Sequence, residues 1–298
     1  MEYIIGIDGG GTKTEAIAYD LHGNELYKNY SDFGNLVLDK KKALYNIASS
    51  IDKSIKVLGN NCVYIYLGLA GVEVGNNKEF IETSLKDRFN TKVKAVNDAD
   101  IALSAVLEGD NGILTIAGTG SISYGIYNGI TARAGGWGHL LGDEGSGYFI
   151  AIEAFKIVIE ERDLGLKESK LSRLLLKSLN ILTDEEIKNF IYSNPKGVIA
   201  AAAPVVIEAA IDGEKNAVDI LKKSAQALSD ITCAVYRRLS INENVNIGIK
   251  GSVLTKSSRM RDLFKEYLSR NIESFTLVNN EVSPAKGAYY LAMKELNK

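Results

Sequence analysis

Residues 4 to 14 read Ile-Ile-Gly-Ile-Asp-Gly-Gly-Gly-Thr-Lys-Thr, an apolar strand that runs directly into three glycines. Glycine lacks a Cβ, so backbone N–H groups in such a turn can approach an anion closely. Thr12 and Thr14 add hydroxyl donors, and Asp8 is placed to hold a cation such as Mg²⁺ through water. A plain tight hairpin explains the same letters, and the Walker A spacing is absent. The stretch therefore predicts a phosphate turn with a metal carboxylate, with a hairpin as the alternative.

Composition places the chain among ordinary globular proteins of about two domains. It has 298 residues, 46% hydrophobic residues and a net charge of −2, which leaves no broad basic field for a nucleic-acid backbone. No signal-peptide pattern and no apolar run of about 18 residues is visible, so we expect a cytoplasmic protein without a membrane segment. Cys62 and Cys233 are far apart, which excludes a disulfide framework and a local four-cysteine metal site.

Hydrophobic periodicity predicts an α/β chain in which strands and helices alternate. In the first third we expect strands at 3–9, 14–20, 25–30, 63–67 and 93–96, and helices at 40–58 and 76–89. Further on, helices are expected at 148–162 and 217–239, after the capping-box residue Thr183, and after Ser283 with Pro284 at its first position.

The second half of the chain repeats the landmarks of the first. Residues 113–121 align with 4–12 at an offset of 109, residues 247–251 with 67–71 at 180, and residues 278–280 with 96–98 at 182. The common order indicates divergent duplication, with extra helices, 217–239 among them, inserted in the second copy.

The two copies differ where chemistry is expected. In this alignment Asp8 corresponds to Ala117 and Asp98 to Asn280, so both carboxylates belong to the first copy. The second copy keeps a glycine turn without the acid. This asymmetry predicts one active cleft between the halves.

Asp98 is the candidate base because it ends a strand, where open α/β sheets often carry functional groups. An aspartate can accept a proton late, as an alcohol attacks a phosphoryl group in a loose transition state. Asp100 is the second candidate, and a helix N-cap is the structural alternative for Asp98.

Two further glycine turns follow strands in the second half. Residues 118–121, Gly-Thr-Gly-Ser, could hold a polyphosphate together with the first turn, or form a simple hairpin. Residues 248–252, Gly-Ile-Lys-Gly-Ser, could present flat backbone to a nucleoside, or make an ordinary strand-to-helix turn.

The glycine-dense segment 135–147 contains the chain's single tryptophan, Trp137, and one of its two histidines, His139. An indole face with nearby carboxylates suits a sugar, whose hydroxyl protons Asp143 and Glu144 could accept; the same acids could instead cap the next helix. A zinc site at His139 lacks a second ligand at metal spacing, and a catalytic triad lacks a nucleophile elbow.

Together these residues resemble the sugar-kinase, hsp70 and actin superfamily, and within it the N-acetylglucosamine kinases and the BadF-type ATPases. The resemblance covers essentially the whole chain, and 135–147 is its most specific match. It implies duplicated actin/hexokinase-like (ribonuclease H-like) domains with an active cleft between them. These would be 1–111 and 112–283, with the helix 284–298 packed back on the first. It also implies ATP and Mg²⁺ as cofactors and a homodimer.

The resemblance also implies roles for individual residues. Asp98 would be the base for the sugar 6-hydroxyl, and Asp8 would serve the metal. The ATP phosphates would contact Gly9, Gly10, Gly11, Thr12, Lys13, Gly118, Thr119, Gly120 and Ser121. Adenosine would contact Gly251 and Ser252, and the sugar would contact Asn35, Gly71, Asp98, Gly136, Trp137 and Asp143.

The expected activity is ATP-dependent phosphorylation of N-acetylglucosamine, with N-acetylmuramic acid as second substrate and glucosamine as third. A regulatory ATPase of the 2-hydroxyacyl-CoA dehydratase activator type is an alternative. Ser121 and Ser123 stand where those activators carry cluster cysteines, which argues against an iron–sulfur protein. The cysteine-rich zinc motif of the repressor and open-reading-frame kinases is also missing. A plain sugar sensor is the third possibility.

Overall fold

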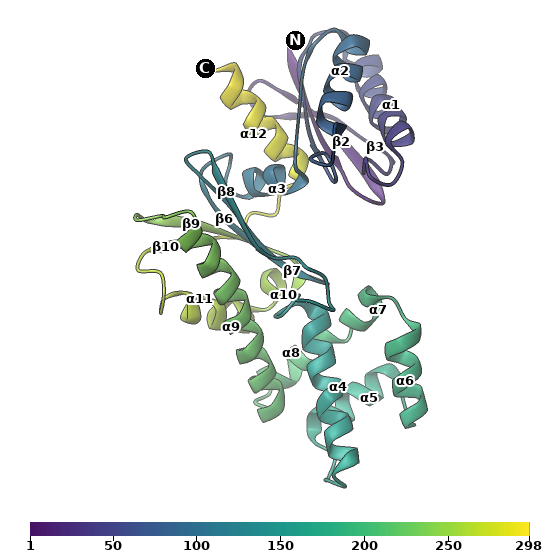
Figure 1. The fold of residues 1–298 in the computed structure, drawn as a ribbon, viewed down its shortest axis with the longest axis vertical. Helices are drawn as coiled ribbons and strands as arrows, with labels where there is room; N and C mark the ends of the chain where they lie inside the picture. Colours follow the sequence, from purple (N-terminus) through teal and green to yellow (C-terminus); the bar gives the residue numbers. More distant parts are fainter. Residues whose placement is uncertain (298) are drawn as a thin grey trace. The chain divides into compact units, whose positions relative to one another are not determined.

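The computed structural model describes residues 1–297, which form two compact units. The first unit is Met1–Gly112 together with the segment that begins at Asn280, and the second is Ile113–Asn279. Each unit is built on one five-stranded sheet (Figure 1). Within the described residues no helix is both long enough and apolar enough to cross a membrane.

The sheet of the first unit has the strand order β3-β2-β1-β4-β5. Its strands are β1 (Tyr3–Gly9), β2 (Lys13–Asp20), β3 (Glu25–Asp32), β4 (Cys62–Leu69) and β5 (Lys92–Val96). Only β2 runs against the others, since β1 pairs with it antiparallel and with β4 in parallel. The carboxyl ends of β1, β3, β4 and β5 therefore share one edge.

Two helices cover each face of this sheet. α1 (Lys40–Leu58) and α2 (Asn77–Phe89) pack on the core that contains Ile5 and Ile7. α3 (Asp98–Val106) and α12 (Pro284–Leu296) lie side by side on the other face, where Ile4 is buried (Figure 1). This alternation follows from the period of two in a strand, which sends successive side chains to opposite faces.

The second sheet has the order β10-β9-β6-β7-β8, which is the order of the first sheet read from the other end. Its strands are β6 (Gly112–Ala117), β7 (Ser121–Tyr127), β8 (Ile130–Gly135), β9 (Val245–Lys250) and β10 (Phe275–Val278). Each copy thus places its first strand at the centre, its hairpin partners on one side and two later strands on the other. The duplication predicted from the sequence is confirmed.

The helices of the second unit fall into two groups. α9 (Lys215–Arg238) follows β8 and packs on β7 and β8, as α1 follows β3 and packs on β2 and β3. Our assignment of this helix to the insertion was therefore wrong, because it occupies the position of α1. α11 (Ser258–Leu268) likewise occupies the position of α2.

The insertion itself lies between β8 and α9. It consists of α4 (Gly147–Asp163), α5 (Lys170–Leu179), α6 (Asp184–Ser193), α7 (Lys196–Ala200) and α8 (Ala203–Ile211). The capping box expected at Thr183 is present at the start of α6, where Thr183 and Glu186 cap each other. A short helix, α10 (Ser252–Lys256), follows β9.

The strand registers correct one of the expected offsets. Ile4 lies opposite Tyr64 and Ile113 lies opposite Ile247, so with β1 and β6 aligned the next strands differ by 183 residues, the gap between positions 64 and 247. The expected offset of 180 therefore aligns β9 with β4 three residues out of register, because sequence similarity alone does not report strand pairing.

The expected match of Asp98 with Asn280 is also wrong. Asn97 caps α3 and Ser283 caps α12, and these helices follow the last strand of each sheet. Asp98 therefore corresponds to Pro284. The conclusion that both acids belong to the first copy stands.

Candidate functional site

The two candidate acids of the first unit lie along one edge of its sheet. Asp8 lies opposite Gly68 in the ladder between β1 and β4, and Gly68 lies opposite Val96 of β5. Asp98 follows two residues later as the first residue of α3. The strand ends thus bring the expected metal carboxylate and the expected base to the same side of the sheet, with β4 between them.

The glycine turn of the first unit is joined to the segment after β3. The N–H groups of Gly34 and Asn35 donate to the carbonyl of Gly10, at 2.9 and 3.1 Å. A Cβ at Gly34 would lie 2.8 Å from the Cα of Gly9, so only glycine allows this approach.

Asn35 in turn lies beside Gly71. The Asn35 Oδ1 atom accepts a hydrogen bond from Val37 N–H at 2.9 Å, and it would lie 3.1 Å from a Cβ at Gly71. Gly71 has a φ of +75°, which suits glycine. Two residues predicted to contact sugar are therefore neighbours at the phosphate turn, although 36 positions separate them in the chain.

The tip of the turn is open to solvent. Gly11, Thr12 and Lys13 are exposed, and the Lys13 ammonium lies 5.3 Å from the ring centroid of Tyr30. Thr14 is different, because its hydroxyl is buried and donates to the Asp32 carbonyl at 2.8 Å. Thr14 therefore ties β2 to the end of β3, while the three exposed residues before it can face a ligand.

The carboxyl group of Asp98 has a raised pKa. Burial is the main cause, and the nearby Glu73 carboxylate adds to it, while the N–H groups of Asp98 and Ala99 work in the opposite direction. The helix cap is Asn97, whose side chain accepts from Ala99 N–H at 3.0 Å. The N-cap alternative for Asp98 is therefore wrong, and its pKa shift favours a proton acceptor.

Asp8 supplies a single carboxylate, which suits a Mg²⁺ ion whose other ligands are water and phosphate oxygens. No cluster of three or more potential metal-binding side chains occurs among residues 1–297. Glu15 lies opposite Asp8 in the ladder, but its carboxylate is bound by Lys28 at 2.9 Å and by the Ser283 hydroxyl. Mg²⁺ commonly uses one or two protein carboxylates together with water and substrate phosphates, and Asp8 fits that pattern.

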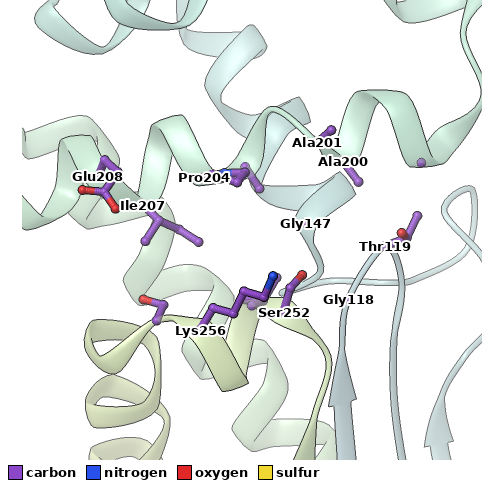
Figure 2. Close-up of a pocket in the computed structure, with 14 residues that line it drawn as sticks. Gly118, Thr119, Gly147, Ala200, Ala201, Pro204, Ile207, Glu208, Ser252 and Lys256 are labelled. Atoms are coloured by element: carbon purple, nitrogen blue, oxygen red, sulfur yellow. The ribbon is translucent and has the colours of Figure 1, made fainter. Parts of the chain in front are cut away.

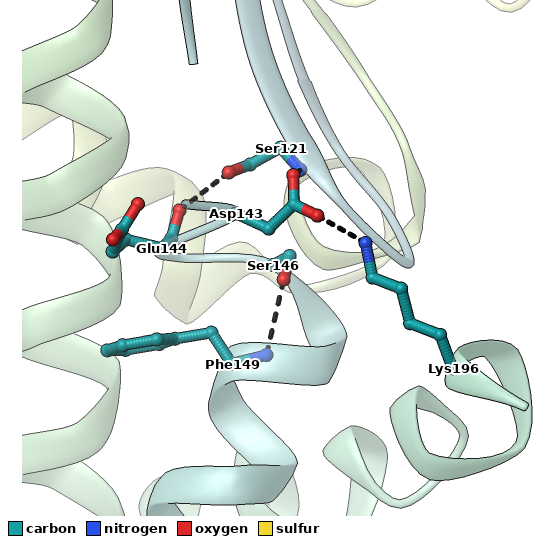
Figure 3. A network of polar contacts seen from close by, with 6 residues as sticks. All are labelled: Ser121, Asp143, Glu144, Ser146, Phe149 and Lys196. Atoms are coloured by element: carbon teal, nitrogen blue, oxygen red, sulfur yellow. Dashed lines mark hydrogen bonds and ion pairs between the residues drawn. The ribbon is translucent and has the colours of Figure 1, made fainter. Parts of the chain in front are cut away.

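In the second unit the glycine turn and the tryptophan segment form one hydrogen-bonded structure (Figure 3). Ser121 N–H donates to Asp143 Oδ1 at 3.0 Å, and the Ser121 hydroxyl donates to the Glu144 carbonyl at 2.7 Å. Gly147 N–H donates to the Gly118 carbonyl at 2.7 Å. Asp143 is only 4% exposed, and its second oxygen forms an ion pair with Lys196.

This network decides what the acids of the segment do. Neither Asp143 nor Glu144 caps α4, because its N-cap is Ser146, whose hydroxyl accepts from Phe149 N–H at 3.2 Å (Figure 3). Both oxygens of Asp143 have protein partners, so a sugar hydroxyl would have to share them.

Trp137 presents an open indole. Its side chain is 64% exposed, and the Arg133 guanidinium lies 4.9 Å from the ring. Gly136 before it has a φ of +71°, and a Cβ there would lie 2.7 Å from Ile122 Cδ1. The imidazole ring of His139 meets the Tyr148 ring edge-on, with 4.9 Å between the ring centroids.

A cavity of about 290 Å³ lies beside the second glycine turn (Figure 2). Gly118 and Thr119 line it on one side and Ser252 on another. Gly251 makes room for this approach: it has a φ of +84°, and a Cβ there would lie under 3.0 Å from the Ala117 carbonyl oxygen. The second and third glycine turns thus meet at one cavity.

Much of the cavity wall was not predicted. It comes from the insertion and the residues after β9, and includes Gly197, Ala200, Ala201, Ala203, Pro204, Ile207, Glu208 and Lys256. These residues are small, apolar or singly charged and carry no motif. Their only signal is their position beside the turn, which requires the tertiary structure.

Two sheets of the same order, each with a glycine turn after its first strand, define a duplicated α/β fold of the actin and hexokinase type. Two structures share this fold along nearly their whole lengths. A Chromobacterium violaceum protein, assigned provisionally as an N-acetylglucosamine kinase, has a TM-score of 0.71 at 24% identity over 98% of this chain and 99% of its own. A Streptomyces griseus ROK family glucokinase, in complex with glucose and AMPPNP, has a TM-score of 0.60 at 16% identity, covering 99% of this chain and 98% of its own.

The chain belongs to the BadF/BadG/BcrA/BcrD ATPase family, whose model matches residues 5–292. It is 34% identical to an N-acetylmuramic acid/N-acetylglucosamine kinase of Clostridium acetobutylicum over 99% of both chains. It is 30% identical to an N-acetyl-D-glucosamine kinase of Dictyostelium discoideum over 98% of both.

Proposed function

We propose that this protein is an ATP-dependent kinase that phosphorylates the 6-hydroxyl of an N-acetylated amino sugar. N-acetylglucosamine is the first substrate and N-acetylmuramic acid the second. The observation that carries the proposal is Asp98, a carboxyl group with a raised pKa on the same sheet edge as the glycine turn that contacts Asn35. The names of the Clostridium and Dictyostelium relatives support the substrate class.

Each element of the site has a role in this proposal. Asp98 accepts the proton of the attacking hydroxyl while the bond from that oxygen to the γ-phosphorus of ATP forms and the bond from the γ-phosphorus to the departing ADP oxygen breaks. The turns 9–13 and 118–121 bind the phosphates, and Mg²⁺ supplied with ATP is bound through Asp8. Adenosine occupies the cavity at Gly251 and Ser252. The sugar contacts comprise Asn35, Gly71, Asp98, Gly136, Trp137 and Asp143.

The direct test measures ADP formation by the purified protein with ATP, Mg²⁺ and each of three sugars: N-acetylglucosamine, N-acetylmuramic acid and glucosamine. We expect both N-acetylated sugars to raise the rate well above the sugar-free rate, and phosphorus NMR of the product to show a 6-phosphate. If none of the three sugars raises the rate, the kinase proposal fails. A 1-phosphate product would overturn the assignment of the acceptor hydroxyl.

Two other activities are separated by the same assay. Glucosamine phosphorylation has weaker support, from a Vibrio cholerae glucosamine kinase that is 24% identical over 80% of the chain. A regulatory ATPase would hydrolyse ATP slowly whether or not sugar is present. A cluster-bearing activator is disfavoured, because burial raises the pKa of Cys62 to about 12 and Cys233 lies inside α9.

Trp137 offers an independent readout of sugar binding, because it is the only tryptophan. We expect N-acetylglucosamine to change its fluorescence, whereas a regulatory ATPase would show no such response. A sugar sensor would show the response without ADP formation. We further propose a homodimer, which light scattering of the purified protein would test.

A further inference from the structure

Lys196 lies at the second glycine turn although it belongs to the helical insertion. It is the first residue of α7, and its ammonium forms an ion pair with Asp143 Oδ2 (Figure 3). A Cβ at Gly120 would lie 3.0 Å from this ammonium and 2.9 Å from Asp143 Oδ1. The Lys196 charge therefore sits directly against the turn that we expect to face phosphate.

Asp143 binds the Lys196 ammonium through one carboxylate oxygen and is itself fixed by a hydrogen bond from the backbone of the turn. Its other oxygen accepts from Ser121 N–H, and its own backbone has a φ of +65°, which is unusual for a residue other than glycine. A carboxylate this deeply buried requires a partner, and Lys196 supplies the opposite charge. The pair thus fixes the ammonium relative to the turn.

The Lys196 ammonium still has room for a ligand. The Lys196 side chain is 25% exposed, and an ammonium has three donors, so binding Asp143 leaves others available. Lysine commonly binds phosphate as a compact point charge.

The same short helix also lines the adjoining cavity. Ala200 of α7 lines this cavity together with Gly118, Thr119 and Ser252 (Figure 2), and Gly197 of the same helix is also part of its wall. A nucleotide whose nucleoside fills this cavity would extend its phosphates toward the turn, where the Lys196 ammonium lies. One helix would then contact both parts of the nucleotide.

We propose that Lys196 binds a phosphate of the nucleotide at the 118–121 turn, and that Asp143 is the positioning residue that holds it there. This proposal deepens the proposed function and rests on nucleotide binding at this site. It assigns to the helical insertion a direct part in binding the phosphates of the nucleotide.

The test compares the affinities of ATP, ADP and adenosine by calorimetry, without sugar, for the wild type, Lys196→Met and Lys196→Gln. We expect both variants to bind ATP and ADP at least tenfold more weakly and adenosine within twofold of the wild type. Lys196→Gln keeps a donor for Asp143, so it gives the answer even if Lys196→Met does not fold. Lys196→Arg keeps the charge and should recover part of the affinity.

Lys170→Met is the matched control, because Lys170 pairs with Asp212 on the exposed surface of the same unit at 3.0 Å. It should leave all three affinities unchanged. Equal weakening of adenosine and ATP by Lys196→Gln would show a purely structural ion pair, and unchanged ATP affinity would show no contact; either overturns the proposal. If the wild type binds none of the three, the proposed function itself fails.

Discussion

Gly68 of β4 packs directly under Ile101 of α3. A Cβ at Gly68 would lie under 3.0 Å from three side-chain carbons of Ile101, which is fully buried. The missing side chain lets α3 approach the sheet and sets the position of Asp98, one turn earlier on the same helix. The location of the candidate base therefore depends on a glycine of the strand next to it.

Gly68→Ala should lower both stability and kcat, because α3 must shift outward. We expect a loss of about 1–3 kcal/mol in the free energy of unfolding, the usual cost of overpacking a core. Urea unfolding and steady-state kinetics measure the two effects. Adding Ile101→Val removes one crowded methyl group, so the double variant should recover part of both losses. Strict additivity of the two substitutions would contradict the packing argument.

Asp98→Asn should abolish sugar phosphorylation while ATP still binds. General base catalysis contributes roughly 10²–10⁴-fold, so we expect kcat to fall by at least about 10². Because the substitution removes a charge that burial disfavours, stability should be equal or higher, and thermal unfolding would exclude misfolding as the cause. Asp100→Asn is the control, and a larger loss there would transfer the role of base to Asp100.

The pH dependence of kcat/KM should show an acid limb set by Asp98. The base must be ionised to accept a proton, and burial raises the pKa of Asp98. As the pH is lowered, kcat/KM should therefore begin to fall at a pH above the ordinary aspartate pKa of about 3.9. Glu73→Gln removes a negative charge that opposes ionisation, so the limb should move to lower pH. Glu79→Gln, on α2, should leave it in place. A limb that does not respond to Glu73→Gln would assign it to another group.

Gly251→Ala should destabilise the protein more than Gly129→Ala does. Both glycines have a left-handed backbone, with φ of +84° and +80°, and alanine there costs about 1–2 kcal/mol. Only Gly251 also faces the Ala117 carbonyl, whereas nothing lies within 4 Å of a Cβ at Gly129. Urea unfolding of the two variants separates the cost of the left-handed backbone from the cost of the steric clash with the Ala117 carbonyl. Equal losses of unfolding free energy in the two variants would mean that the clash costs nothing. Adenosine binding should weaken only in Gly251→Ala.

Some parts of the site could be predicted because their signals are local. Asp8 and its turn are recognisable from a strand followed by glycines, and the caps at Thr183 and Ser283 are read from a few adjacent residues. Other parts could not. Asn97 rather than Asp98 caps α3, although either residue type can serve as a cap, and the choice depends on where the helix begins in the packed structure.

The sequence by itself determined the duplicated α/β plan, because strand periodicity, glycine turns and helix caps are properties of neighbouring residues. Only the tertiary structure decided the 183-residue register of β9, the place of α9 as the counterpart of α1, and the meeting of Lys196 with Asp143. The physical reason is the same in each case. Strand pairing, helix packing and ion pairs join residues that are dozens of positions apart, and no local pattern reports which partners will meet.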